Sequence, residues 1–206
     1  MIPAPVEKAS HTIRLPRAVL FDMDGTLTCP MLDFARIKAE MGIGTRPILE
    51  ALADMTDERR AAAEAVLVRH EEEAAVGSTL NAGCTELLDW LTRRGVRSAV
   101  ITRNSRSSVS TVFARHGLAF DVVVAREDAP PKPDPRPLLL ACKRIGFGPD
   151  DAWMVGDGQY DIEAGAAAGI RTVWVSHGRS PPFAARPWWT VPDLGELQAL
   201  LAQAVP

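Results

Sequence analysis

The chain has 206 residues and a formal net charge of −3, with 47% apolar and 24% charged residues. This composition is typical of a globular protein with one sizeable domain and room for a small insertion. The weak negative charge, without any basic run, argues against nucleic acid as the main partner. No apolar run approaches the ~18 residues that a membrane span needs, so we expect no membrane partner either.

Three scattered cysteines indicate the cellular compartment. Cys29, Cys84 and Cys142 are odd in number and lack CxxC spacing, which argues against a disulfide framework and against a zinc site. We therefore expect a reducing compartment, the cytoplasm. Residues 1–16 contain early prolines and no apolar core segment, which predicts a loose lead-in rather than a secretory signal. Nothing in the sequence indicates an oligomeric state.

An apolar run over residues 18–21 ends abruptly in two acids, Asp22 and Asp24, followed by Gly25 and Thr26. A short run rich in Val, Leu and Phe predicts a buried strand, and the glycine predicts a tight turn after it. Two carboxylates at the exit of a buried strand repel each other and are poorly solvated, which favours a cation or a proton between them. The alternative is a solvated turn that caps the next helix.

The segment after this turn predicts helices without strands, because its apolar residues recur at helical spacing until Gly77. We expect residues 31–79 to form a separate small helical domain inserted after the first strand. We interpret Glu71, Glu72 and Glu73 within it as a solvated helix face. The expected helices span residues 34–41, 48–55 and 56–75.

From residue 80 onward, predicted strands alternate with predicted helices. This alternation is typical of βαβ units in a parallel sheet with helices on both faces. We therefore predict an α/β fold with a Rossmann-like, doubly wound parallel sheet, formed by residues 17–30 and 80–206. We expect Trp188 and Trp189 to pack against the sheet edge, with a partner surface as the alternative. Strands are predicted at 96–102, 120–124, 152–155 and 171–175, and helices at 85–94, 107–116, 135–145, 160–168 and 194–203.

Polar residues follow the predicted strands, at the edge where ligands of parallel sheets bind. Thr102 ends the second strand and offers a hydroxyl and following amides to an anion near a helix N-terminus. Lys132 lies between prolines, and its point charge suits a phosphoryl oxygen, although such a lysine is commonly just solvated. Asp157 and Asp161 follow the fourth strand and offer the oxygens that Mg²⁺ prefers, with simple helix capping as the alternative.

A carboxylate nucleophile, a metal ion and a cation around one small volume predict phosphoryl transfer through an aspartyl-phosphate. The residues also resemble the four signature motifs of the haloacid dehalogenase-like hydrolases, in the order of that family. Residues 31–79 resemble the cap of its phosphoglycolate-phosphatase-like branch, and the resemblance covers about residues 17–175. The motifs are Asp22-Met23-Asp24-Gly25-Thr26, Thr102, Lys132 and Gly156-Asp157-Gly158-Gln159-Tyr160-Asp161.

The resemblance implies a catalytic role for four matching residues. Asp22 would attack phosphorus and bind Mg²⁺ through its other oxygen. Asp24 would protonate the leaving alcohol and then activate water, and a raised pKa would suit this task. Thr102 would hydrogen-bond the phosphoryl group, and Lys132 would balance charge.

The resemblance likewise implies a Mg²⁺ site. Asp157 would bind the metal, Asp161 would orient its shell or ligate directly, and Asp24 would contribute its backbone carbonyl beside Asp22. Arg103 and Asn104 are equally consistent with substrate contacts and with a surface salt bridge. The expected phosphate- or substrate-binding residues are Gly25, Thr102, Arg103, Asn104 and Lys132.

We therefore predict a Mg²⁺-dependent phosphatase that acts on a small phosphorylated metabolite. Members of the family that cleave carbon–halogen or phosphonate bonds lack an acid at the position of Asp24, so the resemblance favours phosphate esters. A phosphosugar mutase is one alternative, less favoured because the helical segment has no basic cluster beyond Arg36, Lys38 and Arg46. A catalytically retired phospholigand-binding protein is the other. We assign no chemistry to the four histidines.

Overall fold

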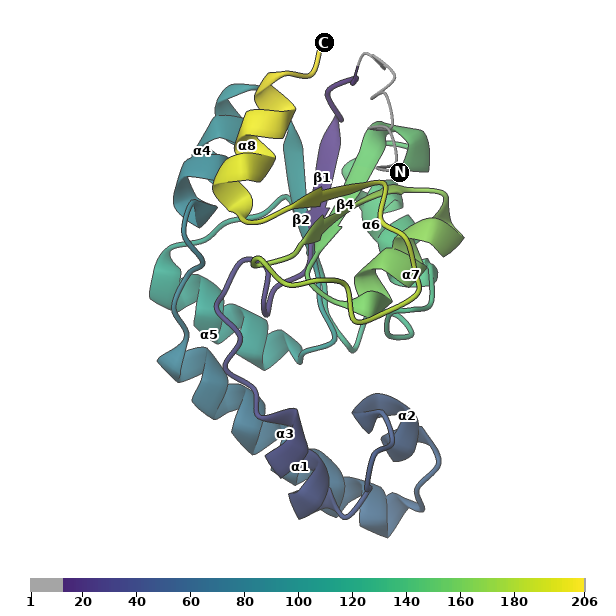
Figure 1. The fold of residues 1–206 in the computed structure, drawn as a ribbon. Helices are drawn as coiled ribbons and strands as arrows, with labels where there is room; N and C mark the ends of the chain where they lie inside the picture. Colours follow the sequence, from purple (N-terminus) through teal and green to yellow (C-terminus); the bar gives the residue numbers. More distant parts are fainter. Residues whose placement is uncertain (1–12, 206) are drawn as a thin grey trace, which may run out of the picture.

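The computed structural model describes residues 13–205, and most of the lead-in predicted for residues 1–16 therefore lies outside the described residues. A six-stranded, all-parallel sheet in the order β3-β2-β1-β4-β5-β6 forms the centre of the fold (Figure 1). Its strands are β1 (Ala18–Phe21), β2 (Arg97–Ile101), β3 (Val122–Val124), β4 (Ala152–Gly156), β5 (Arg171–Val175) and β6 (Trp189–Val191).

Helices cover both faces of this sheet. Alternate residues of a strand point to opposite faces, so Val19 and Phe21 pack into one apolar cluster and Ala18 and Leu20 into another. The first cluster includes residues of α4 (Cys84–Arg93), α5 (Arg106–His116) and α8 (Leu194–Ala202). The second includes residues of α6 (Arg136–Ile145) and α7 (Gln159–Ala168), and the 3₁₀ turn η1 (Pro149–Asp151) precedes β4. This arrangement confirms the predicted doubly wound α/β fold.

Local signals set the helix ends. The Ser105 side chain accepts a hydrogen bond from the backbone N–H of Ser108 and so caps α5, and Asp193 caps α8 in the same way. At its other end α5 stops at Gly117, whose φ of 65° is a left-handed conformation that glycine adopts without strain. These residues explain why the predicted bounds lie within a residue or two of those observed.

The helical segment, which we call the insert (residues 31–79), has an apolar core of its own. It consists of α1 (Phe34–Met41), α2 (Ile48–Ala53) and α3 (Asp57–Gly77). Figure 1 shows the insert beyond the carboxyl ends of the strands, with α3 leading back toward α5. Its core consists of Ile37, Met41, Ile43, Ile48, Ala51, Leu52, Ala63 and Leu67.

Two stretches differ from the predictions. The strand β6, which is not predicted from the sequence, has three residues and is ordered by parallel pairing with β5. Trp189 thus belongs to the edge strand itself, whereas the ring centroid of Trp188 lies 4.9 Å from that of Trp153, a residue of the interior strand β4. The end of the lead-in is not loose, because Leu15 donates a backbone hydrogen bond to Val205 over 2.8 Å.

Two further findings concern membrane-spanning helices and the cysteines. Between residues 13 and 205, no helix is both long enough and apolar enough to cross a membrane. The three cysteines are free thiols.

Candidate active site

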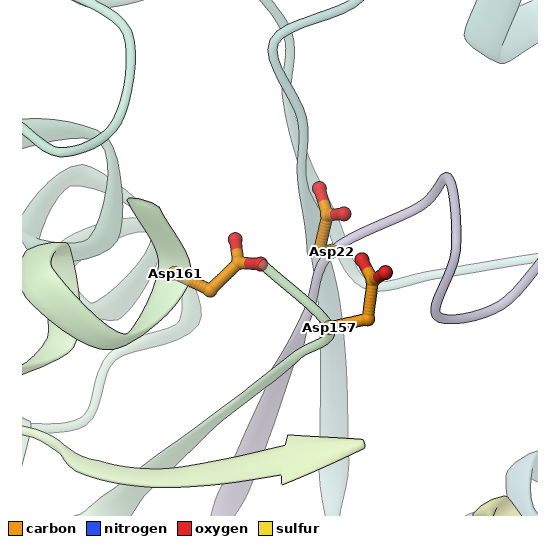
Figure 2. Close-up of side chains that lie close together, drawn as sticks. All are labelled: Asp22, Asp157 and Asp161. Atoms are coloured by element: carbon orange, nitrogen blue, oxygen red, sulfur yellow. The ribbon is translucent and has the colours of Figure 1, made fainter. Parts of the chain in front are cut away.

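Three carboxylates meet beyond the carboxyl ends of β1 and β4. Because Phe21 and Val155 are partners in these neighbouring parallel strands, the acids that follow them emerge side by side. Asp22 follows β1, Asp157 follows β4, and Asp161 lies in the first turn of α7. Figure 2 shows the three side chains close together, and one oxygen of each lies within 4.8 Å of those of the others.

Lys132 lies at the base of this cluster and is only 2% exposed. Its Nζ donates to Asp22 Oδ1 over 2.7 Å, to Asp161 Oδ1 over 2.6 Å and to the Ile101 carbonyl over 2.7 Å. Three acceptors use all three donors of an ammonium group, which compensates for its burial. Burial acts to lower the pKa of Lys132, but the carboxylates of Asp161 and Asp22 raise it above its ordinary value. The lysine is therefore a fixed positive charge.

The cluster holds more negative charge than Lys132 can balance. Burial, with Asp161 and Asp157 nearby, raises the pKa of Asp22 to about 8 despite the attraction of the lysine. Burial and the charge of Asp161 also raise the pKa of Asp157. Oxygen donors with unbalanced negative charge fit a hard divalent cation such as Mg²⁺. The residues present therefore suit the metal that the resemblance implies.

Glycine is required where the chain turns beside these acids. Gly25 has a φ of 82°, and a Cβ atom built there would lie 2.5 Å from Asp157 Oδ2. A Cβ atom at Gly156 would overlap the side chain of Asp161. The carbonyl of Gly25 lies 2.6 Å from Nε2 of His177, so this histidine helps to fix the turn.

Asp24 points to the other side of the site and lies outside the three-carboxylate cluster. Its Oδ2 accepts a hydrogen bond from Asn104 Nδ2 over 2.5 Å, and its Oδ1 accepts from Thr28 Oγ1 over 3.3 Å. Burial raises the pKa of Asp24 to about 6, although both hydrogen bonds act to lower it. A carboxyl group with this pKa can release and take up a proton near neutral pH.

The residues after β2 join the site in different ways. Thr102 is buried, and its Oγ1 accepts from the backbone N–H of Asn104 over 3.1 Å. Arg103 forms an ion pair of 2.9 Å with Glu50 of the insert and lies 4.4 Å above the ring of Tyr160. It also donates to the Lys132 carbonyl. Arg103 therefore both lines the cavity and forms a salt bridge, so the two interpretations given for it do not exclude each other.

A cavity of about 410 Å³ opens between the sheet and the insert. The sheet domain lines it with mainly polar residues, which include every predicted site residue except Gly25, whereas the insert supplies mainly apolar side chains. The predicted site residues in the lining are Asp22, Asp24, Thr102, Arg103, Asn104, Lys132, Asp157 and Asp161.

Known proteins place the chain in a family. The model of the family described as haloacid dehalogenase-like hydrolase matches residues 16–169. This chain belongs to that family. A haloacid dehalogenase-like hydrolase domain-containing protein of Arabidopsis thaliana is 31% identical, covering 90% of this chain and 83% of the relative. Phosphoglycolate phosphatase 1 of Pseudomonas aeruginosa is 30% identical, and the match covers 93% of this chain and 82% of that relative.

The fold agrees with this assignment. The crystal structure of a hydrolase from Pseudomonas syringae superposes with a TM-score of 0.78 at 22% identity, covering 91% of this chain and 99% of that chain. The family predicted from the sequence is therefore confirmed, and with it the prediction of a hydrolase.

One prediction about this hydrolase is wrong. Glu71 is not part of a solvated helix face, because it is only 3% exposed. Its Oε1 lies 2.6 Å from Arg126 Nη1, and its Oε2 accepts from the Ser105 backbone N–H over 3.4 Å. The helical spacing of apolar residues could have indicated that Glu71 is buried, because Leu67 and Ala75 lie one turn on either side of it and are also buried. Burial raises the pKa of Glu71 even though Arg126 acts to lower it.

Several residues that contact the site were not predicted from the sequence. Arg179 Nη2 lies 3.1 Å from Asp157 Oδ2, and Trp174 Nε1 donates to the Asp157 carbonyl over 2.9 Å. Arg179 lies in the loop after β5, where no sequence pattern marks it. Glu50 and Tyr160, the partners of Arg103, are likewise brought in by the tertiary fold.

Proposed function

We propose that this hydrolase is a Mg²⁺-dependent phosphatase that cleaves a small phosphomonoester through an aspartyl-phosphate on Asp22. The observation that carries the proposal is the contact of Asp22 with the buried Lys132 ammonium, beside the Asp157 and Asp161 carboxylates. The relative named phosphoglycolate phosphatase supports the reaction class. We also propose a cytoplasmic location, in keeping with three free thiols.

Asp22 acts as the nucleophile. Its carboxylate oxygen forms a bond to phosphorus while the bond from phosphorus to the ester oxygen breaks. Lys132 holds Asp22 Oδ1 in place at 2.7 Å and contributes positive charge next to the transferring group. Bound Mg²⁺, held by Asp22, Asp157 and Asp161 with the Asp24 carbonyl, would screen the phosphate from the anion that attacks it.

Asp24 carries the proton between the two halves of the reaction. In its acid form it donates a proton to the leaving alcohol, and as a carboxylate it then takes a proton from the water that attacks the aspartyl-phosphate. The second step releases inorganic phosphate and restores Asp22. A pKa of about 6 suits a group that must do both. Asn104, which donates to Asp24 over 2.5 Å, keeps its carboxyl group oriented.

The insert acts as a cap over this chemistry. Two ion pairs join it to the sheet domain, one between Glu50 and Arg103 and the other between Glu71 and Arg126. A covered site excludes bulk water and strengthens the electrostatic interactions inside it. Thr102, which is buried and lines the cavity, would hydrogen-bond the phosphoryl group.

A phosphate-release assay over a panel of phosphomonoesters tests the proposal. We expect release that requires Mg²⁺ and stops with a chelator, and trapping of labelled phosphate on the protein after acid quench. Absence of release from well-folded protein over the whole panel would contradict the proposal and favour a retired ligand-binding protein. Conversion of a sugar phosphate into its isomer, without free phosphate, would identify a mutase instead.

A further inference from the structure

The part of the cavity lining that the insert supplies is mainly apolar. Its lining residues come from all three helices and from the segment before α1. Two large members are notably exposed, Phe34 at 55% and Met31 at 50%. Exposed apolar surface inside a concave site gains free energy when an apolar ligand covers it. The apolar lining consists of Pro30, Met31, Leu32, Phe34, Pro47, Ile48, Leu49 and Leu67.

Cations are scarce around this surface. Among the described residues that line the cavity, Lys132 is committed to Asp22 and Asp161, and Arg103 is committed to Glu50. Lys38 is the remaining cationic residue among the described residues of the lining. Its Nζ lies 3.5 Å from a backbone carbonyl.

The other basic residues of interest in the insert point elsewhere. Arg36 pairs with Glu40 over 2.9 Å, and Arg46 pairs with Asp54, both at exposed positions. Neither arginine lines the cavity. Glu71 does line it, and its carboxylate is already paired with Arg126, which is not among the lining residues. A carboxylate or second phosphate on the substrate would therefore meet one lysine at most, among apolar side chains.

We propose that the leaving group of the substrate is uncharged and predominantly apolar, and that Phe34, Leu49 and Leu67 bind it. This inference rests on the proposed phosphatase function and specifies its substrate class. Burying an alkyl or aryl group against these side chains is favourable, whereas burying an unpaired carboxylate there is costly. Phosphoglycolate, whose leaving group carries a carboxylate, is accordingly a poor fit.

Binding of phosphonates, which retain the anion but are not esters, tests the inference without requiring turnover. We compare hexylphosphonate, methylphosphonate and carboxypentylphosphonate by calorimetry with the full chain and Mg²⁺. Hexylphosphonate is expected to bind about tenfold more tightly than the other two. Equal or tighter binding of carboxypentylphosphonate would overturn the inference. So would hexylphosphonate binding no more tightly than methylphosphonate, whether or not any ester is hydrolysed.

Single substitutions test whether the insert is responsible for the tighter binding of hexylphosphonate. Phe34→Ala is expected to weaken hexylphosphonate binding about fivefold while leaving methylphosphonate unchanged. Val76→Ala is the matched control, because Val76 is 62% exposed on α3 and does not line the cavity. Equal effects of the two variants would overturn the assignment of the apolar surface. A preference for the carboxylated ligand that disappears in Lys38→Gln would overturn it too, by identifying a carboxylate-binding lysine.

Turnover separates this inference from the proposed function. If esters are hydrolysed but phosphoglycolate is preferred to hexyl phosphate in kcat/KM, the phosphatase assignment stands and the apolar leaving group is wrong. If hexylphosphonate binds selectively and no ester releases phosphate, the apolar site stands and the catalytic proposal is wrong.

Discussion

The sheet domain and the insert face the same cavity with opposite kinds of side chain. The sheet domain presents charged groups that are buried and fixed, such as Lys132 with its three acceptors. The insert presents apolar side chains that remain open to solvent, such as Phe34. Charged groups that must act on a reacting phosphate need fixed geometry, whereas recognition of an apolar group tolerates a looser surface. Under the proposed function, the sheet domain would carry the chemistry and the insert would carry the choice of substrate.

The two regions are joined by charge rather than by apolar contact alone. Glu71 reaches from α3 to Arg126 and Ser105, and Glu50 reaches from α2 to Arg103. The two arginines are equally exposed at 21%, but the Glu71 side chain is only 3% exposed whereas that of Glu50 is 40% exposed. They should therefore contribute very different amounts to the attachment of the insert.

The largest effect is expected from Asp22→Asn, which removes the nucleophile from the sheet domain. Turnover of any phosphomonoester should fall by at least about a thousandfold, because an amide oxygen cannot replace the carboxylate. The fold should persist, since the amide retains an oxygen that can accept from Lys132. Steady-state kinetics measures the turnover, and circular dichroism measures whether the fold persists. Substantial remaining activity would show that the nucleophile lies elsewhere.

Glu71→Ala should break the buried connection between the two regions. It leaves Arg126 without its carboxylate partner, and we expect a loss of about 3 kcal/mol in the free energy of unfolding, measured with urea. Glu72→Ala is the matched control on the same helix, because Glu72 is exposed and should change stability by no more than about 0.5 kcal/mol. Similar losses in both variants would refute the distinction between these neighbours.

Asn104→Ala should shift the pH dependence of the reaction without removing the proton carrier. The hydrogen bond from Asn104 stabilises the charged form of Asp24 and so lowers its pKa, which lies at about 6. Its loss raises that pKa, so Asp24 stays protonated to higher pH. The rate with an alkyl phosphate, which needs a proton for its leaving group, should then decline at higher pH than in the wild type.

An aryl phosphate provides the internal control for Asn104→Ala. Its leaving group needs little protonation, so the decline with rising pH should be weak in both proteins. A shift of the alkyl phosphate profile toward lower pH would contradict the role assigned to this hydrogen bond.

The smallest effect is expected from Glu50→Gln, which weakens the exposed connection. Its side chain is 40% exposed, so stability should fall by less than about 1 kcal/mol, and the loss should shrink at high salt. KM should respond more than kcat, because Arg103 is released at the boundary of the cavity. Glu64→Gln, at an exposed position of α3, serves as control in thermal unfolding and kinetics. A loss as large as that of Glu71→Ala would refute the ranking of the two pairs.

The residues that the sequence makes predictable are those whose position follows from chain direction. Asp22, Lys132 and Asp157 follow strands, and parallel strands end at one edge of the sheet, so their proximity can be inferred without coordinates. Glu71 could not be placed in this way, because its partner Arg126 is 55 residues away and nothing local distinguishes it from Glu72. β6 was missed for a related reason, since three residues carry too little periodicity to mark a strand.

Glu71 also lies at a mechanically important point of α3. Residues 57–71 of this helix span about 21 Å, and the rest of the insert packs against that arm. A tilt of about three degrees around the Glu71–Arg126 contact would move the far end by about 1 Å, a displacement that can cost a reaction about a hundredfold. Under the proposed function, the accuracy with which a substrate is held would therefore depend on how firmly α3 is held, by the Glu71–Arg126 ion pair together with its packing against α5.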